Sequence, residues 1–187
     1  MKGKKRIKQE YIILILKVII IISILIFLVM RFVFASVHID GTSMEPTLRN
    51  NEYGIANRFV VSEETITRFD IVVVDEEDEG QIVKRVIGLP NETIQYKDDT
   101  LYINGQLVLE PFLDQDYIES HTMEHKIPFT SDFGPITLKK DEYFIIGDNR
   151  MNSKDSRAFG PIKIDSIIAK DIIILYPFDQ IRIENSK

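Results

Sequence analysis

The sequence predicts a mostly β protein, in which an antiparallel β domain follows one N-terminal transmembrane α-helix. Three observations lead to this expectation. A long apolar run opens the chain, short β-branched runs separated by turn residues make up most of the remaining residues, and no long helical period occurs after the first run. We therefore expect a basic tail at residues 1–10, a membrane anchor at 11–34 and a β-rich domain at 35–187.

The predicted anchor is the run from Tyr11 to Met30, twenty residues that contain one charge, Lys17. At about 1.5 Å per helical residue the run spans roughly 30 Å, the thickness of the hydrocarbon core of a bilayer. A buried helix of a soluble domain fits less well, because apolar residues surround the whole circumference. A cleavable secretory signal stays open as an alternative. Its apolar core is usually only about 7 to 15 residues long, but a small-residue cleavage site could lie after Ala35.

Charge predicts how this helix lies in the membrane. Five basic residues precede the apolar run, whereas only Arg31 closely follows it. Because positive charge favours the cytoplasmic side, we expect a single-pass protein of the cell membrane with a cytoplasmic N-terminus and an extracytoplasmic domain. The lipid bilayer is thus a predicted partner. The five basic residues are Lys2, Lys4, Lys5, Arg6 and Lys8.

The composition of residues 35–187 excludes several functions. This part holds 16 Lys or Arg and 28 Asp or Glu, a net charge of −12. A domain this acidic is a poor candidate for binding nucleic acid, so we expect no such partner. The chain has no cysteine, which excludes disulfides, thiolate zinc ligands and a cysteine nucleophile.

Short runs rich in β-branched and aromatic residues predict the strands of the domain. Asn104-Gly105 between two of them is a strong hairpin signal, because both central residues of such a turn reach positive φ. Residues 110–135 lack a clear period and contain three prolines, so we expect a long loop or a small insertion there. The expected strands are 69–74, 81–87, 93–96, 100–103, 106–109, 142–146 and 170–176.

Ser43, within the stretch Gly41 to Leu48, is the candidate nucleophile. A serine hydroxyl needs a base within hydrogen-bond reach and donors for the oxyanion that its attack creates. Taken alone, a serine between a glycine and a proline is more often an ordinary turn residue. The stretch itself holds no base. The histidines of the chain have no spacing that singles one out; they are His38, His121 and His125.

Lys84 is the candidate base. If residues 81–87 form a strand, its side chains alternate between two faces. Lys84 then lies between Ile82 and Val86, and Arg85 is turned away. A lysine acts as a base only when neutral, and apolar burial lowers its pKa by penalising the charged form. An edge-strand lysine that blocks aggregation is the structural alternative.

A third polar stretch, Gly147 to Arg157, directly follows the strand expected at 142–146. Its Gly, Asp, Asn and Ser residues favour tight turns with hydrogen bonds from side chain to backbone. Taken alone, this stretch is most simply interpreted as a polar surface loop.

Together the three stretches resemble the bacterial type I signal peptidase family, in its Gram-positive form with a single anchor. They come in the order of that family behind an N-terminal helix, and the resemblance covers most of residues 38–176. Ser43-Met44-x-Pro46-Thr47-Leu48 is similar to the nucleophile box, Lys84-Arg85-Val86-Ile87-Gly88-Leu89-Pro90 to the lysine box, and Gly147-Asp148-Asn149-Arg150 through Ser153-x-Asp155-Ser156-Arg157 to the third box.

The resemblance implies a serine endopeptidase that removes N-terminal signal peptides from exported pre-proteins, after small residues at the first and third positions before the cut. Pre-proteins at the membrane surface are then its partners, and the chemistry needs neither a cofactor nor a metal ion. Ser43 is implied as nucleophile, Lys84 as general base, and Ser153 as the residue that hydrogen-bonds and orients the Lys84 amine. The implied substrate and oxyanion neighbourhood comprises Gly41, Thr42 and Met44, and the implied supports of the third box are Asp148, Arg150, Asp155 and Arg157.

Two positions depart from the family pattern. Some members carry a serine two residues before the nucleophile, whose hydroxyl helps to bind the oxyanion, where this chain has Gly41. The oxyanion must then be bound by backbone N–H groups, chiefly that of Ser43. The lysine box continues into Asn91-Glu92 in place of Gly-Asp.

Two alternatives stay open at this point. A self-cleaving Ser/Lys regulator shares the dyad chemistry, but such proteins carry a DNA-binding module where this chain has its membrane helix. A non-catalytic, membrane-anchored β module would make all three matches coincidental.

Overall fold

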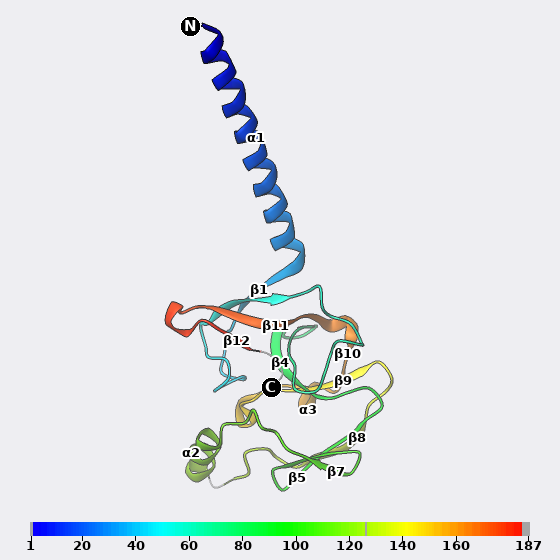
Figure 1. The fold of residues 1–187 in the computed structure, drawn as a ribbon. Coiled ribbons are helices and arrows are strands. Elements are labelled where there is room, and N and C mark those ends of the chain that lie inside the picture. The colour runs from blue at the N-terminus through cyan, green and yellow to red at the C-terminus, as the bar shows by residue number, and fades with distance from the viewer. Residues whose placement is uncertain (1, 126, 185–187) are drawn as a thin grey trace.

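The computed structural model describes residues 2–125 and 127–184, without the side chains of residues 2–8 and 124–125. A single long helix, α1 (Lys2–Val33), projects from a β domain that holds the rest of the chain (Figure 1). Its segment Gln9–Val33 is long and apolar enough to cross a membrane, with a mean hydropathy of 3.5. The predicted anchor is therefore helical. The helix begins earlier than expected, because it runs through most of the predicted tail.

The β domain contains two sheets in which all paired strands are antiparallel, which confirms the predicted fold class. The larger sheet has the order β1 (Phe34–His38), β2 (Tyr53–Asn57), β11 (Ile167–Tyr176), β3 (Ile71–Glu76), β4 (Gly80–Gly88), β9 (Glu142–Ile146) and β10 (Ile162–Lys163), with β12 (Arg182–Glu184) paired to β11. The smaller sheet has the order β7 (Gln106–Val108), β6 (Thr100–Ile103), β5 (Thr93–Lys97) and β8 (Phe133–Thr137).

The centre of the larger sheet is buried on both faces, as the continuous apolar sequence of β3 requires. Ile71 and Val73 enter one core cluster, and Val72 and Val74 enter another on the opposite face. β4 lies between β3 and β9. Lys84 is therefore on an interior strand, and the structure excludes the edge-strand interpretation of this lysine.

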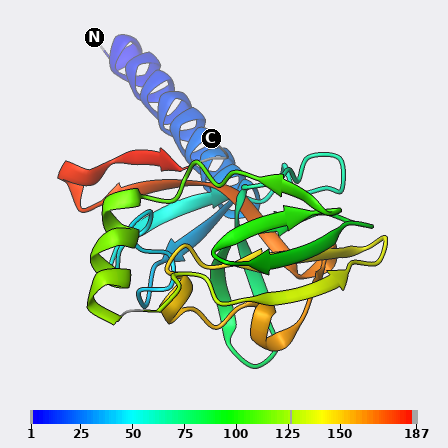
Figure 2. The same cartoon turned by 90° about the horizontal axis from the view of Figure 1, so that it is seen from below.

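The smaller sheet lies at the end of the domain that is remote from α1 (Figures 1 and 2). Asn104 and Gly105 have φ values of 52° and 77°, so the predicted hairpin turn is confirmed. One face of this sheet packs on the larger one through a third core cluster, which includes Ile94, Leu101 and Phe144. The residues of the candidate site lie where the two sheets and the loops between them meet.

The expectation of a loop at residues 110–135 is wrong, because α2 (Gln115–His125) and the start of β8 lie there. The Asp114 carboxylate caps the first turn of α2, since its Oδ1 accepts a hydrogen bond of 2.9 Å from the Tyr117 N–H. Polar residues lie on all sides of this helix and leave no apolar stripe for a periodicity to reveal. Three other strands, β1, β2 and β12, are too short and too mixed in composition to have been predicted.

Four short helices complete the fold. They are η1 (Arg150–Asn152), α3 (Ser156–Phe159), η2 (Ile164–Ser166) and η3 (Phe178–Gln180).

Candidate active site

The loop between β1 and β2 carries Ser43. Its apolar residues hold it in place: Met44 is 2% exposed and Leu48 is fully buried, both in the same core cluster as Ile39. Ser43 itself is half-buried beside a cleft of about 340 Å³. The predicted nucleophile therefore faces an accessible space while its neighbours in sequence fix the backbone beneath it.

Lys84 lies on β4 opposite this loop. Its Nζ donates hydrogen bonds to Ser43 Oγ at 2.8 Å and to the Val83 carbonyl oxygen at 3.0 Å, and the residue is 3% exposed. Burial lowers the pKa of Lys84, although the carboxylates of Asp155, Glu79 and Asp148 oppose that shift. The structure thus brings together the two residues that the sequence predicted as nucleophile and base.

Asn149 and Asn152 attach the loop after β9 to the loop that carries Ser43. The Asn149 N–H donates to the Ser43 carbonyl oxygen at 3.1 Å, and its Nδ2 donates to the Thr42 carbonyl oxygen at 3.1 Å. Asn152 Nδ2 donates to Thr42 Oγ1 at 2.7 Å. Sequence reasoning did not identify these two asparagines as positioning residues, because only the tertiary structure shows which loop they face.

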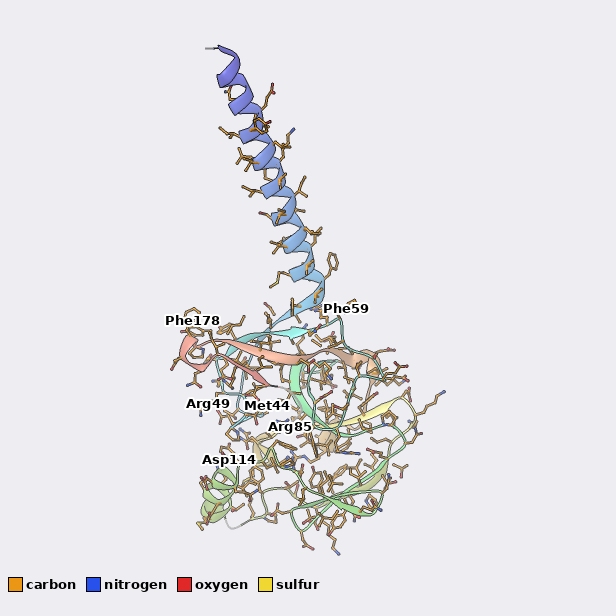
Figure 3. The ribbon with its side chains drawn as sticks, viewed as in Figure 1. Met44, Arg49, Phe59, Arg85, Asp114 and Phe178 are labelled. Atoms are coloured by element: carbon orange, nitrogen blue, oxygen red, sulfur yellow. The ribbon has the colours of Figure 1, made fainter. Side chains whose placement is uncertain are left out.

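Asp148 and Arg85 form a buried ion pair behind Ser43. Arg85 donates from Nε to Asp148 Oδ1 at 2.8 Å and from Nη2 to Oδ2 at 2.6 Å, and both residues are almost fully buried. Thr47 Oγ1 donates to Asp148 Oδ2 at 2.5 Å, which ties the nucleophile loop to the same carboxylate. Arg85 does face away from Lys84, but towards a carboxylate inside the protein. Figure 3 shows it in the interior of the β domain.

Asp155 and Arg157 fix the other end of the loop. The Asp155 carboxylate accepts hydrogen bonds of 2.8 Å from Arg157 Nε and Nη2 and one of 3.0 Å from the Gly147 N–H. Burial alone raises the pKa of Asp155, but hydrogen bonding and the charge of Arg157 outweigh it, so that the pKa falls. This carboxylate is thus ionised at neutral pH and close enough to influence Lys84.

Arg150 connects the same loop to the smaller sheet. Its guanidinium donates to Glu110 Oε1 at 2.6 Å and to the Tyr96 hydroxyl at 3.2 Å, and its Nε donates to the Gly147 carbonyl oxygen at 3.1 Å. Burial lowers the pKa of Arg150, but Tyr96 and Glu110 raise it by more, so the guanidinium stays charged. Arg150 therefore supports the loop from a side that the sequence alone did not reveal.

Ser153 does not form the predicted hydrogen bond to Lys84 in this structure. Its Oγ is buried and has no hydrogen-bond partner among the described residues, as is also true of Asn149 Oδ1. Ser153 Oγ instead lies against Gly147, where an added Cβ would meet it and the Ser43 carbonyl oxygen well inside contact distance. Ser153 thus remains close to the nucleophile loop without touching the amine.

The histidines do not supply a base for Ser43. His38 lines the cleft but stacks on Tyr53, with ring centroids 4.2 Å apart. His121 lies on α2 and stacks on Tyr117 at 4.0 Å. His125 is at the end of α2, and its side chain lies outside the described part of the chain. No hydrogen bond joins Ser43 to either described histidine side chain.

Gly41 adopts a φ of +100°, a conformation that residues with a side chain rarely reach. The space around its Cα is open, so backbone strain and not crowding disfavours a serine at this position. Its N–H donates to Asn50 Oδ1 at 3.0 Å. Among the described residues no acceptor receives a hydrogen bond from the Ser43 N–H, which leaves that donor free for an oxyanion.

The fold and this geometry define a serine hydrolase whose candidate base is a lysine. The sequence matches the signal peptidase family, peptidase S26, over residues 12–176, and the chain belongs to that family. It is therefore a hydrolase of the serine peptidase class, and the predicted family is confirmed. Residues 177–187 lie beyond the matched range.

Named relatives agree with this assignment. The chain is 41% identical to signal peptidase I P of Bacillus subtilis subsp. natto over 184 residues, which cover 97% of this chain and 98% of the relative. It is 38% identical to signal peptidase I S of Bacillus subtilis strain 168 over 188 residues, which cover 99% and 100%. A crystal structure of a signal peptidase I from Enterococcus faecalis V583 is 38% identical, with a TM-score of 0.48, and covers 56% of this chain and 95% of that one.

Gly147→Ala tests the contact between the third box and the nucleophile loop. The added methyl group meets the Ser43 carbonyl oxygen, a backbone atom that can move only with the loop. Because small misplacements of reacting groups are costly, we expect kcat/KM for a model pre-protein to fall about 10²-fold. Thermal unfolding of the same variant serves as the control, and full activity in a folded Gly147→Ala protein contradicts the proposed contact.

Glu79 and Lys154 provide a test of the charge around Lys84. The two form an ion pair at the rim of the cleft, and the Glu79 carboxylate raises the pKa of Lys84. Activity that needs neutral Lys84 rises with pH through its pKa. Glu79→Gln should therefore move the acidic limb of the kcat/KM profile to lower pH, and Lys154→Gln should move it to higher pH.

The double variant should lie near the parent, and Lys140→Gln, which removes an exposed lysine elsewhere, should leave the profile unchanged. Shifts of the two single variants in the same direction are incompatible with this electrostatic account.

Lys84→Met should unfold at a higher temperature than the parent near pH 7. A lysine whose folded pKa lies below its unfolded one binds fewer protons in the native state, so its burial lowers stability most below the folded pKa. This penalty shrinks as pH rises towards the unfolded value, and so should the gain from Met. A gain of about 1 kcal/mol raises Tm by roughly 2–4 °C. A clearly lower Tm at pH 7 would mean that Lys84 is a charged, paired structural residue.

Proposed function

We propose that the chain is a membrane-bound endopeptidase that cleaves N-terminal signal peptides from exported pre-proteins after small residues, with Ser43 as nucleophile and Lys84 as general base. The observation that carries the proposal is the 2.8 Å separation between Lys84 Nζ and Ser43 Oγ, at a lysine that is 3% exposed. Family membership supports the substrate class, because the relatives named above are signal peptidases.

In the proposed reaction, neutral Lys84 takes the proton of Ser43 Oγ as that oxygen bonds to the scissile carbonyl carbon. The carbonyl π electrons move to oxygen, and the oxyanion accepts a hydrogen bond from the Ser43 N–H. When the C–N bond breaks, the Lys84 ammonium returns the proton to the leaving amine. Water then attacks the Ser43 ester with Lys84 again as base, which releases the signal peptide acid and restores the hydroxyl.

An open strand edge offers a track for the substrate. β4 pairs with β3 along Gly80–Glu76 to Arg85–Ile71, but with β9 only from Arg85 to Gly88. Within the described chain, the second edge of β4 from Gly80 to Lys84 therefore has no strand partner and faces the cleft. An extended peptide can add to such an edge by main-chain hydrogen bonds, which bind any sequence. Ile39, Ile82 and Met44 line the same cleft, which favours small apolar side chains near Ser43.

The proposed orientation places α1 across the membrane and the β domain outside the cytoplasm. The charge asymmetry of the sequence around α1 supports it. A second support is the exposure of Phe59 and Phe178, 84% and 78%, on the face of the domain nearest to α1 (Figure 3). Aromatic side chains of this kind favour the interface between lipid and water. Membrane anchoring would hold the cleft near substrates that are themselves in the bilayer.

The alternatives weighed from the sequence have less support. Membership in a peptidase family argues against a non-catalytic module. A self-cleaving regulator has a DNA-binding module where this chain has an apolar helix of 25 candidate membrane residues.

Ser43→Ala and Lys84→Ala should each abolish processing of a model pre-protein by the purified full-length chain in detergent. Nucleophile and base act as a unit, so each loss should cost about as much as both together, at least roughly 10³-fold in kcat. Lys97→Ala, at an exposed lysine of β5, is the control and should cleave normally. Mass spectrometry of the product maps the cut. Substantial cleavage by either active-site variant rules out the dyad, and a cut away from small residues rules out the proposed specificity.

A further inference from the structure

A groove separates the end of α1 from the β domain. It has a volume of about 440 Å³ and lies outside the cleft that holds Ser43 and Lys84. Most of its wall is apolar, but two arginines from different elements also line it. The lining residues are Phe27, Met30, Arg31, Phe34, Ser36, Ile55 and Arg58.

The two arginines are held at the same level of the molecule. Arg31 is in the last turn of α1. Arg58 directly follows β2, and its N–H donates to the carbonyl oxygen of Val33, the last residue of α1, at 2.8 Å. The backbone thus brings Arg58 to the point where the helix ends, so that both guanidinium groups border one groove.

Neither guanidinium has a protein partner in the part of the chain that the structure describes. The buried Arg85 and Arg150, by contrast, each bind a carboxylate through two nitrogens or more. No aspartate or glutamate lines the groove, although residues 35–187 carry a net charge of −12. Two unpaired cations on an otherwise acidic domain mark a site that complements an anion.

The position of the groove indicates which anion. The candidate span Gln9–Val33 has 25 residues, about 37 Å of helix, whereas the hydrocarbon core is about 30 Å thick. The last turn of α1 then reaches the head-group layer, where phosphate groups lie. Guanidinium groups bind phosphate through paired, charge-assisted hydrogen bonds. The apolar side chains of Phe27 and Met30 continue from the arginines towards the hydrocarbon.

We propose that this groove binds one phospholipid with an anionic head group, its phosphate on Arg31 and Arg58 and its upper acyl chain along Phe27, Met30 and Phe34. The proposal rests on the insertion of α1 in the bilayer that is part of the proposed function. Such a lipid joins the helix to the β1–β2 edge of the domain. It thereby fixes the height of the cleft above the membrane.

Native mass spectrometry of the full-length chain tests the site. The protein is released from vesicles of phosphatidylcholine that contain a minor fraction of phosphatidylglycerol, and the retained lipids are counted. We expect the parent to retain one phosphatidylglycerol and the double variant Arg31→Gln/Arg58→Gln to lose about tenfold of the lipid-bound fraction, as expected for losing charge-assisted hydrogen bonds. The matched control, Lys97→Gln/Lys140→Gln, removes two exposed charges elsewhere and should retain the lipid.

Further arms separate the possible outcomes. Soluble glycerol phosphate at the same concentration should not compete, because it lacks acyl chains. Equal retention of phosphatidylglycerol by the parent and the arginine variant, equal loss in the lysine control, or equal retention of phosphatidylcholine would each overturn the proposal. Ser43→Ala should retain the lipid as the parent does, so failure of the peptidase mechanism leaves this readout unchanged. Failure of membrane insertion would instead appear as a chain that does not associate with the vesicles at all.

Discussion

The burial of the Lys84 amine against the Ser43 hydroxyl is the constraint on which the rest of the structure depends. An ammonium group in this place is poorly solvated, and a neutral amine is able to take the serine proton. Three carboxylates, Asp155, Glu79 and Asp148, nevertheless oppose the neutral form. The structure limits that opposition by giving two of them, Asp155 and Asp148, arginine partners of their own at hydrogen-bond distance.

Those ion pairs also assemble the site from segments that are distant in sequence. The Asp148 carboxylate holds Arg85 of β4 and Thr47 of the nucleophile loop together. Buried pairs of this kind add little net stability but are costly to break, about 3–5 kcal/mol when one partner is removed, so they specify one arrangement. Asn149 completes the assembly by holding the Ser43 backbone directly.

The sequence predicted what depends on local pattern or on whole motifs. The membrane helix, the Asn104-Gly105 turn and the position of Lys84 on an apolar strand all follow from spacing within a few residues. The helix α2 and the short strands β1 and β2 could not be predicted, because tertiary contacts and not an apolar period stabilise them. The asparagine contacts to Thr42 and Ser43, and the failure of Ser153 to reach Lys84, depend on how two loops approach each other. Motif order alone does not contain that information.

Direct titration of the Lys84 amine tests the central claim most closely. The full-length Ser43→Ala protein in detergent, with isotope-labelled lysine, allows the Lys84 side-chain signal to be followed by NMR and assigned by its loss in Ser43→Ala/Lys84→Met. The account predicts that Lys84 titrates below the ordinary lysine value of 10.5 and below the exposed lysines of the same protein. A Lys84 signal that titrates together with the exposed lysines, or above them, would contradict a neutral-amine base at this site.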